Sequence, residues 1–523
     1  MSRKLYADPT GKFVHQIVLD ACEKSADHVV LIDTSVDPFG RITGAEYVEL
    51  VNCAARGFVA AGIRPGEVVA IFLSNSWEYA VAYHAATLAG AVVTPMNPSY
   101  QEREARYQLE SSGAAFLVTD APRNANIDLG GLPALRRVFT TRSPAPGAEM
   151  FENLLRPSSA PLPTPAEDPR LALAALPYSS GTTGLPKGVM LSHSNLVTNV
   201  YQTLIPSEPS CFTSEEVMLC FLPLYHIYGL TVGLNLMLTI GATLVLMPRF
   251  DLDRALRLMI QEGITTIPCV PAVLNAFADA AEKGAFPKEH RVKWVKSGAA
   301  PLSRELARRF PELTGIPIRQ GYGMTEASPV THIGSLAPEL YCPESIGLPV
   351  AETNCRIIGE DGREVDVGDI GELVMRGPQF MLGYWKAPEA TASALRDGWY
   401  WSGDIARRDE CGRYFIVDRR KEMIKYKGFA VAPAEVEATL MEHPAVRDCG
   451  VVGRADEVAG EIPCAFIVLR DGGPGSDSLK KELCTFVGDR LTHYKQPRDV
   501  EFIATIPRNP SGKILRRELR KLL

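Results

Sequence analysis

Residues 178–188 read YSSGTTGLPKG, a run of small hydroxyl residues and glycines that ends in a lysine and a glycine. Such a run suits phosphates, because hydroxyls and backbone N–H groups donate hydrogen bonds and a lysine adds positive charge. The groups belong to Ser179, Ser180, Gly181, Thr182, Thr183 and Lys187. The run is not a Walker loop, since Pro186 and Gly188 occupy the positions of its second glycine and its Ser/Thr. Taken alone, it predicts either a phosphate loop or a plain surface turn.

Further stretches of chemical interest follow along the chain. YGMTE ends in Glu326, a hard carboxylate suited to Mg²⁺ between phosphates, and WYWSGD ends in Asp404, whose two oxygens can accept both hydroxyls of a ribose. GRYFIVDRRKEMIKYKGF supplies several cations, and PRNPSGKILRR places Lys513 in a Gly/Ser turn before a helix. The cations of the longer stretch are Arg419, Lys421, Lys425 and Lys427. Each stretch alone could be an ordinary turn, helix start or solvated surface segment. Together they favour a nucleotide site.

The elements that must position these residues follow from the hydrophobic pattern. Between residues 67 and 120, and again between 242 and 323, short apolar runs alternate with amphipathic helical runs, which predicts parallel sheets covered by helices. The Pro/Ala/Ser-rich segment 143–169 is predicted to be a surface connection. Beyond residue 345, short strands broken by EDG and ECG turns predict a barrel-like antiparallel subdomain, and residues 421–523 predict a compact α+β module. The expected fold class is therefore α/β plus α+β.

Composition narrows the class of protein. The 523 residues are 46% hydrophobic and 22% charged with a net charge of −6, so no basic excess favours nucleic acid. The uncharged run 229–248 contains glycines, Asn235 and Pro248, and is predicted to be a buried helix followed by a buried strand, not a membrane span. The 11 cysteines form no C-x-x-C pair, which favours reduced thiols. We expect a cytoplasmic monomer or homodimer.

The motifs, taken in order, resemble those of the adenylate-forming enzymes. This superfamily includes acyl-CoA synthetases, peptide-synthetase adenylation domains and firefly luciferase. The stretches that carry the resemblance are YSSGTTGLPKGV, LPLYHIYG, GYGMTE, WSGD, VDRRKEMIKYKGF and NPSGKILRR. Within the superfamily, IKYKGFAVAPAEVE and LPLYHIYGL are most similar to 4-coumarate–CoA ligases and their luciferase relatives. The resemblance implies a large domain of residues 1–420, with two helix-covered sheets, and a small mobile domain of residues 421–523 that turns about a hinge near Lys421.

The resemblance also implies a reaction in two halves, with ATP, Mg²⁺ and coenzyme A. A carboxylic acid first attacks the α-phosphate of ATP, giving an acyl-adenylate and pyrophosphate, and the thiol of coenzyme A then displaces AMP. Lys513 would bridge the carboxylate and the α-phosphate, Glu326 would hold Mg²⁺, and residues 179–187 would hold the departing phosphates. The nucleotide positions implied by the family pattern are Ala299, Ala300, Gln320, Gly321, Tyr322, Thr325, Ile333, Asp404 and Arg419.

For the second half, the family pattern implies that Lys513 swings out and that Lys427 and Gly428 swing in. A residue without Cβ at position 428 lets a pantetheine chain pass close to the backbone. Arg249, in the stretch MPRF, matches a position that contacts the CoA nucleotide, although it could equally be a surface charge at a strand end. His226 would border both the acyl pocket and the thiol path, or it could be a packed core histidine.

The acid substrate is expected to be aromatic or arylpropenoic. The implied acyl-binding residues are His226, Tyr228, Val232, Lys296, Ala299, Gly321, Gly323, Pro329, Val330, Lys421 and Lys425. Small residues among them leave room for a ring, and Lys296 must either reach solvent or meet a polar group of the substrate, because a lone buried ammonium is costly. The alternatives are a medium- or long-chain fatty acid, an acyl-AMP ligase that loads a carrier protein, and a non-catalytic acyl-AMP binder.

Overall fold

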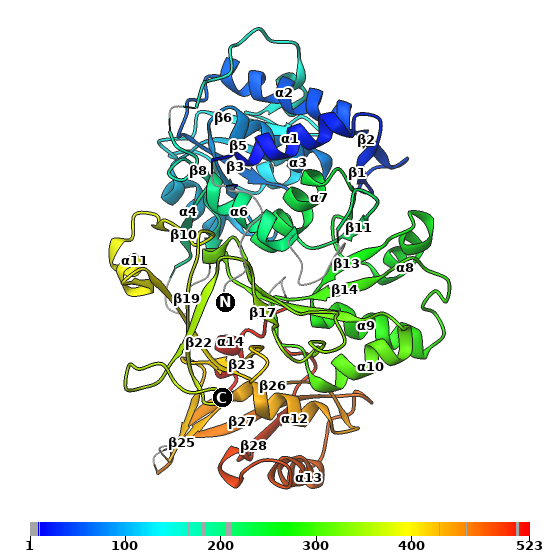
Figure 1. Cartoon of the computed structure of the whole chain (residues 1–523), viewed down its shortest axis with the longest axis vertical. Helices are drawn as coiled ribbons and strands as arrows, with labels where there is room; N and C mark the ends of the chain where they lie inside the picture. The colour runs from blue at the N-terminus through cyan, green and yellow to red at the C-terminus, as the bar shows by residue number, and fades with distance from the viewer. Residues whose placement is uncertain are drawn as a thin grey trace.

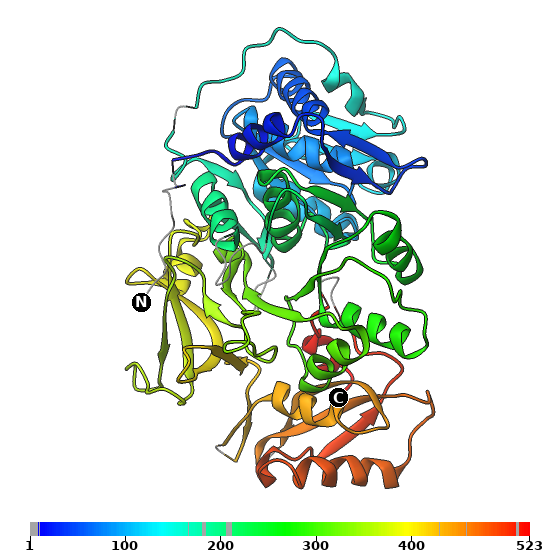
Figure 2. The same ribbon diagram turned by 45° about the vertical axis from the view of Figure 1, so that its right-hand side comes forward.

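A computed structural model describes residue 9 and residues 11–165, 167–179, 185–204, 212–427, 429–456, 458–508 and 512–523. Within these ranges the chain forms two nine-stranded sheets and two five-stranded sheets. The N-terminal helices lie at one end of the molecule and the C-terminal strands and helices lie at the other end, in both Figure 1 and Figure 2. The structure thus confirms a large N-terminal part with two helix-covered sheets and a smaller sheet, followed by a small α+β unit.

The central strands of the first sheet come from the predicted alternation between residues 67 and 120. Its strands are, in order, β20 (Gly383–Tyr384), β10 (Lys187–Ser192), β8 (Leu173–Ala175), β4 (Val92–Pro95), β3 (Val68–Phe72), β5 (Ala114–Asp120), β6 (Arg137–Thr141) and β7 (Glu149–Met150), and β9 (Tyr178–Ser179) pairs with β10. The strands from β8 through β7 run parallel, whereas β9 and β20 pair antiparallel with β10. The predicted parallel sheet is therefore mixed at the edge that carries the phosphate run.

The second sheet combines the predicted series 242–323 with the start of the chain. Its order is β17 (Leu348–Pro349), β16 (Val330–Ile333), β15 (Ile318–Gly323), β14 (Trp294–Ser297), β13 (Thr266–Cys269), β11 (Val217–Cys220), β12 (Thr243–Leu246), β1 (Val29–Asp33) and β2 (Gly40–Thr43). Strands β15 through β1 are parallel, and β2, β16 and β17 are antiparallel. The polar residues after β14 and β15 therefore meet at the carboxyl end of one parallel sheet.

Helices cover these sheets and pack into one large hydrophobic core and a smaller apolar cluster on the first sheet, to which the helix Glu102–Ser112 belongs. They are α1 (Val14–Lys24), α2 (Gly44–Ala60), α3 (Trp77–Leu88), α4 (Glu102–Ser112), α5 (Ala121–Ala125), α6 (His193–Leu204), α7 (Leu236–Thr239), α8 (Leu252–Gln261), α9 (Pro271–Glu282) and α10 (Arg304–Thr314). Helix α3 contacts β3 and β4 of the first sheet and β1 of the second, and is buried nearly all round. The hydroxyl of Ser76 caps its first turn by accepting from Tyr79 N.

Two segments outside the repeating pattern test the sequence predictions. The run 229–248 forms the π-helix η2 (Gly229–Asn235), α7 and β12, as predicted, and no helix in the described ranges is long and apolar enough to cross a membrane. The connection 143–169 is not merely a surface segment, which corrects the prediction. Its 3₁₀-helix η1 (Phe151–Leu155) buries Phe151 and Leu154 against α2.

The remaining two sheets carry the rest of the motifs. The third sheet has the order β18 (Asn354–Ile358), β19 (Gly371–Arg376), β22 (Trp399–Arg408) and β21 (Leu395–Arg396), with β23 (Tyr414–Arg419) beside β22 and α11 (Pro388–Ala394) nearby. The C-terminal unit contains β25 (Phe429–Val431), β24 (Ile424–Tyr426), β27 (Gly460–Leu469), β26 (Val446–Asp456), β28 (Asp499–Phe502), α12 (Pro433–Met441), α13 (Asp477–Gly488), η4 (His493–Lys495) and α14 (Arg516–Arg520). It has apolar clusters of its own.

Candidate active site

Glu326 contacts one end of the predicted phosphate run. It lies in the 3₁₀-helix η3 (Thr325–Ala327), directly after β15, and is buried. Its Oε1 accepts hydrogen bonds from Ser179 Oγ at 3.1 Å and from Tyr384 OH at 2.8 Å. Ser179 pairs with Lys187 across β9 and β10, and the Lys187 ammonium lies 5.7 Å from the centre of the Tyr384 ring. One carboxylate and one ammonium group are therefore gathered beside this run.

Asp404 forms a second polar centre on the third sheet. It stands opposite Arg419 in the β22–β23 ladder, and its Oδ1 lies 3.1 Å from Arg419 Nε. The hydroxyl of Tyr322, at the end of β15, donates a hydrogen bond to Asp404 Oδ2. Burial raises the pKa of Tyr322, and the charge of Asp404 raises it as well, so the phenol stays protonated and donates. These contacts fix the orientation of a carboxylate that is 3% exposed.

Lys513 reaches the same place from the C-terminal unit. The pKa of Lys513 falls from 10.5 to about 8, mainly because the amine is buried and also because Arg419 lies near it, while Asp404 acts in the opposite direction. The preceding residue, Gly512, has φ +80°, and a Cβ placed there would lie 3.3 Å from Val270 Cγ2. Val270 precedes α9 in the large N-terminal part. The loop that carries Lys513 therefore contacts both parts of the chain.

The residues predicted to surround the adenine lie at the carboxyl ends of β14 and β15, where ligands of parallel sheets bind. Gln320 is buried, and its Oε1 has no hydrogen-bond partner among the described residues. Ala299 is exposed in the left-handed region with φ +67°, and Ala300 is half-buried beside it. Ile333, at the end of β16, pairs with Gly321, and Thr325 is half-buried at the start of η3. The structure brings these positions to one edge of the second sheet.

Tyr228, Lys296 and Gly321 lie together beside this edge. The Tyr228 hydroxyl donates a hydrogen bond to the Lys296 carbonyl at 3.2 Å, and a Cβ placed on Gly298 would lie 3.4 Å from the Tyr228 ring. A Cβ placed on Gly321 would lie 3.1 Å from Lys296 Cε. The tyrosine ring therefore passes beside Gly298 and the lysine side chain passes beside Gly321, so larger residues at either glycine would have to displace them.

Lys296 is buried on the central strand β14, with 4% of the residue exposed. Its pKa falls from 10.5 to about 7, first because of burial and second because of the positive charge of Arg319. Its amine has no hydrogen-bond or ion-pair partner among the described residues. Burial of an amine costs free energy, and groups with such strongly shifted pKa values are frequent at functional sites.

Other predicted pocket residues have positions that are explained by local contacts. His226 Nδ1 accepts a hydrogen bond from Tyr228 N at 3.2 Å, and burial lowers the pKa of His226 to about 4, so the ring is neutral near pH 7. Val232 is fully buried in η2, and Val330 is buried at the start of β16. A Cβ on Gly323 would lie 2.1 Å from the carbonyl oxygen of Pro329. Glycine is thus required at position 323 because the backbone of Pro329 lies so close. This contact, and not a need for space in the pocket, explains its small size.

Four predicted cations lie on exposed surface in this structure. They are Arg249, Lys421, Lys425 and Lys427. Arg249 lines an open hollow together with Asp251 and Arg257. Lys425 lies on β24, and Lys427 follows it with φ +48° and a backbone hydrogen bond to Ala459, so both belong to the C-terminal unit. Ser180, Gly181, Thr182, Thr183 and Gly428 lie outside the described residues.

Sequence reasoning did not single out Tyr384 or Val270. Tyr384 lies in the stretch LGYW and holds Glu326, a contact that joins β20 to η3. Its aromatic and hydroxyl character was visible in the sequence, but nothing there indicated its distance from Glu326. Val270 is an ordinary apolar residue whose place beside the Lys513 loop depends wholly on the tertiary fold.

Similarity to known proteins extends over nearly the full length of the chain. The model of the AMP-binding enzyme family matches residues 18–385, and the model of the AMP-binding enzyme C-terminal domain matches residues 435–513. The chain is 38% identical to 4-coumarate–CoA ligase 5 of Oryza sativa subsp. japonica over 519 residues, which are 98% of this chain and 94% of the relative. It is 37% identical to 4-coumarate–CoA ligase 1 of Narcissus pseudonarcissus over 522 residues, with 98% and 93% covered.

Solved structures show the same fold. The crystal structure of the anthranilate CoA ligase AuaEII in complex with anthranoyl-AMP matches with a TM-score of 0.89 at 25% identity and covers 98% of both chains. A benzoate CoA ligase from Burkholderia xenovorans LB400 matches with a TM-score of 0.86 at 27% identity, covering 97% of this chain and 100% of that one.

Proposed function

The chain belongs to the AMP-binding, adenylate-forming enzyme family, and from this premise we propose that it is an ATP-dependent ligase that joins a carboxylic acid to coenzyme A through an acyl-adenylate. The observation that carries the proposal is the meeting of Lys513, from the C-terminal unit, with Arg419 and Asp404 of the N-terminal part. We also propose that the two functional domains divide at Lys421, between β23 and β24.

The first half-reaction brings two anions together. A carboxylate oxygen of the acid attacks the α-phosphorus of ATP, the bond from that phosphorus to the β-bridging oxygen breaks, and pyrophosphate leaves with the electron pair. Positive charge must therefore be fixed where carboxylate and phosphate meet. Lys513 is proposed to supply it, because the protonated amine can reach both groups from the side of Asp404. Its lowered pKa keeps it about half protonated near pH 8.

Glu326 fits a role as a magnesium ligand. Both donors that hold it use Oε1, and Oε2 accepts no hydrogen bond from the described residues. The described residues contain no group of three or more ligating side chains, so a cation here would need phosphate oxygens and water as its other ligands, which is the usual arrangement for Mg²⁺. When bound, Mg²⁺ would neutralise charge on the phosphates. Ser179, Lys187 and residues 180–183 are proposed to hold the phosphates that leave.

The nucleoside is proposed to lie across the carboxyl ends of β14 and β15. Asp404 would accept hydrogen bonds from the two ribose hydroxyls, and Arg419 would orient that carboxylate. Tyr322 would face the adenine, with Ala299, Ala300, Gln320 and Ile333 around it and Thr325 at the α-phosphate. The support is the single edge at which these residues meet, with Asp404 buried and held by Tyr322 and Arg419.

The second half-reaction requires a different arrangement of the C-terminal unit. The thiol sulfur of coenzyme A attacks the acyl carbon, the bond from that carbon to the AMP oxygen breaks, and the thiol proton passes to solvent. We propose that the unit turns about Lys421, so that Lys427 and Gly428 approach the acyl-adenylate and Arg249 contacts the CoA nucleotide. His226, with a pKa of about 4, is a poor proton acceptor and is proposed to border the path of the thiol.

The acid is proposed to be aromatic or arylpropenoic. Tyr228 and Val232 supply apolar walls, and the buried Lys296 amine lacks a partner that a ring hydroxyl or similar polar group would provide. The curated relatives named as 4-coumarate–CoA ligases support the same class. A medium- or long-chain fatty acid is the main alternative, and a carrier-protein thiol in place of coenzyme A is a second.

The test is release of pyrophosphate from ATP across a panel of acids, with and without coenzyme A. The panel comprises coumarate, cinnamate, benzoate and fatty acids of different length. The proposal expects acid-dependent release of pyrophosphate, with the highest kcat/KM for an arylpropenoic acid, and CoA-dependent formation of a thioester. Preference for a fatty acid would overturn the substrate assignment, and an adenylate that forms but never passes to coenzyme A would overturn the acceptor. Absence of release with every acid would indicate a non-catalytic binder.

A further inference from the structure

Lys513 lies beside a backbone pairing, here called the closure, between residues 507–508 and residues 514–515. Arg508 and Ile514 form an isolated antiparallel bridge, and Leu515 N donates a hydrogen bond to Pro507 O at 2.8 Å. Lys513 comes directly before the second paired end. The direction of its side chain therefore depends on how this closure is held against the rest of the C-terminal unit.

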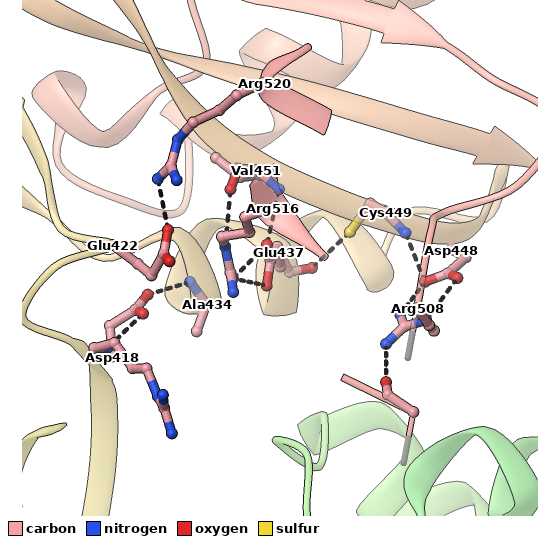
Figure 3. A network of polar contacts seen from close by, with 12 residues as sticks. Asp418, Glu422, Ala434, Glu437, Asp448, Cys449, Val451, Arg508, Arg516 and Arg520 are labelled. Atoms are coloured by element: carbon pink, nitrogen blue, oxygen red, sulfur yellow. Dashed lines mark hydrogen bonds and ion pairs between the residues drawn. The ribbon is translucent and has the colours of Figure 1, made fainter. Parts of the chain in front are cut away.

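Arg508 holds the closure from the first end. Its Nη1 donates to the carbonyl of Gly512, the residue before Lys513, at 2.8 Å. Its Nη2 lies 2.8 Å from Asp448 Oδ1, and its Nε lies 3.4 Å from Asp448 Oδ2. Asp448 is itself fixed on β26, because its Oδ1 accepts from Cys449 N at 2.9 Å. One guanidinium thus connects the backbone beside Lys513 to strand β26, and Figure 3 shows its contact with Asp448.

Arg516 anchors the other end to the same strand. Its Nη2 lies 2.7 and 2.8 Å from the two carboxylate oxygens of Glu437 on α12, and its Nε donates to the carbonyl of Val451 on β26 at 3.2 Å. In Figure 3 this pair lies in the middle of the network, between the Arg508–Asp448 contact and the Arg520–Glu422 contact. Both arginines therefore attach the segment around Lys513 to β26.

The two anchors oppose movement of the Lys513 amine toward solvent. The Lys513 amine is buried and lies near the positive charges of Arg419 and Arg516, so burial and like charge both oppose its charged form in this position. A lysine on a loosely held loop would relieve both by moving toward solvent. Two anchors that bind the backbone around Lys513 to β26, the strand at one edge of this sheet, oppose that movement, because they make the loop move together with the C-terminal unit.

We propose that Arg508, through Asp448 and the Gly512 carbonyl, is a positioning residue that holds the Lys513 loop for acyl-adenylate formation. This inference rests on the proposed function of Lys513. Arg508 does not touch the reacting atoms, and it is expected to matter little in the second half-reaction, for which Lys513 is proposed to have moved away. Its guanidinium makes a fork that an ammonium cannot copy, so lysine should replace it only in part.

The test compares Arg508→Ala with Arg454→Ala. Arg454 pairs with Asp499 at the other end of β26, and the side-chain exposures of the two pairs are similar, at 39% and 23% against 29% and 33%. Acyl-adenylate formation and thioester formation from premade acyl-adenylate are measured separately for each full-length variant. Arg508→Ala should lower adenylate formation by roughly tenfold to a hundredfold and leave thioester formation within about twofold. Arg508→Lys should recover part of the loss, and Arg454→Ala should change neither half.

A second readout does not depend on turnover. Labelling of Lys513 by an amine reagent, followed by mass spectrometry across pH, should give a midpoint near 8 in the unmodified chain and a higher midpoint in Arg508→Ala, because the amine would gain access to water. Should Arg508→Ala fold poorly, Asp448→Asn provides the same comparison.

The outcomes separate the inference from the function on which it rests. Equal loss of both half-reactions, or unchanged adenylate formation and unchanged Lys513 labelling, would overturn the positioning role. An unmodified chain that forms no adenylate with any acid would instead overturn the proposed function, whatever Arg508 does to the labelling.

Discussion

Replacement of Lys296 by methionine separates the functional role of this residue from its effect on stability. Methionine has a similar length and no charge, so Lys296→Met keeps the volume beside Gly321 and removes the buried amine. We expect the variant to be more stable than the unmodified chain and less able to distinguish polar acids from apolar ones. Lys288→Met is a suitable control, because Lys288 is exposed.

The size of the stability effect follows from the surroundings of the amine. The pKa of Lys296 falls from 10.5 to about 7, and one pKa unit corresponds to about 1.4 kcal/mol, so the charged form is disfavoured by up to roughly 5 kcal/mol. Methionine removes this penalty, so the gain in the free energy of unfolding lies between zero and about 5 kcal/mol. We expect a gain in that range at pH 7.

The pH dependence gives the sign of the effect. Between pH 7 and 10.5 the unfolded chain binds a proton at this lysine that the folded chain has released, so the free energy of unfolding of the unmodified chain rises with pH in this interval. Lys296→Met lacks this rise. The difference in thermal midpoint between the two proteins should therefore be largest at pH 7 and below and should shrink as the pH rises toward 10.5, as measured by calorimetry.

The catalytic effect is a change of selectivity. A hydrogen bond to a charged group is worth about 1.5–3 kcal/mol, which corresponds to a change of roughly 10- to 150-fold in kcat/KM. The ratio of kcat/KM for ring-hydroxylated to unsubstituted acids should fall by about this factor in Lys296→Met. Equal changes for both acids, or a thermal midpoint that falls in Lys296→Met, would refute the reasoning.

Two further substitutions test other contacts of the site. Tyr384→Phe removes one of the two donors to Glu326 Oε1 and should raise several-fold the Mg²⁺ concentration needed for half-maximal adenylate formation, without changing the KM for the acid; an unaltered Mg²⁺ titration would contradict this. Asp404→Ala removes the proposed ribose acceptor and should raise the KM for ATP by about tenfold or more, and the KM for 2′-deoxy-ATP should rise less, so an equal rise for both nucleotides would place the ribose elsewhere.

Much of the fold could be predicted, because strands and helices in the first sheet have clear local signals. The apolar run AAFLVTD coincides with β5, and the alanine-rich run WEYAVAYHAATL coincides with α3. The place of β1 in the second sheet could not be predicted, since its partner β12 lies far along the chain. The burial of Phe151 could not be predicted either. The polar, Pro-rich composition of the connection indicated a surface segment, and Phe151 and Leu154 are isolated apolar residues within it.

The candidate site divides in the same way. Charged residues in recognisable motifs, such as Asp404 and Lys513, could be chosen from the sequence as candidates. Their meeting depends on three sheets and the C-terminal unit, and the pair Tyr384–Glu326 exists only after β20 joins β10. Gly323 was predicted from its small size to leave room in the pocket, but the close carbonyl of Pro329 explains why this residue is a glycine.

The central claim is that Lys513 supplies the positive charge for acyl-adenylate formation and Lys427 serves the second half-reaction. The most direct measurement is the rate of each half in Lys513→Ala and in Lys427→Ala, with pyrophosphate release for the first and thioester formation from premade acyl-adenylate for the second. We predict that Lys513→Ala loses at least about a hundredfold in the first half and retains the second, whereas Lys427→Ala shows the opposite pattern. Equal loss of both halves in both variants, or release of ADP and phosphate in place of AMP and pyrophosphate by the unmodified chain, would contradict the account.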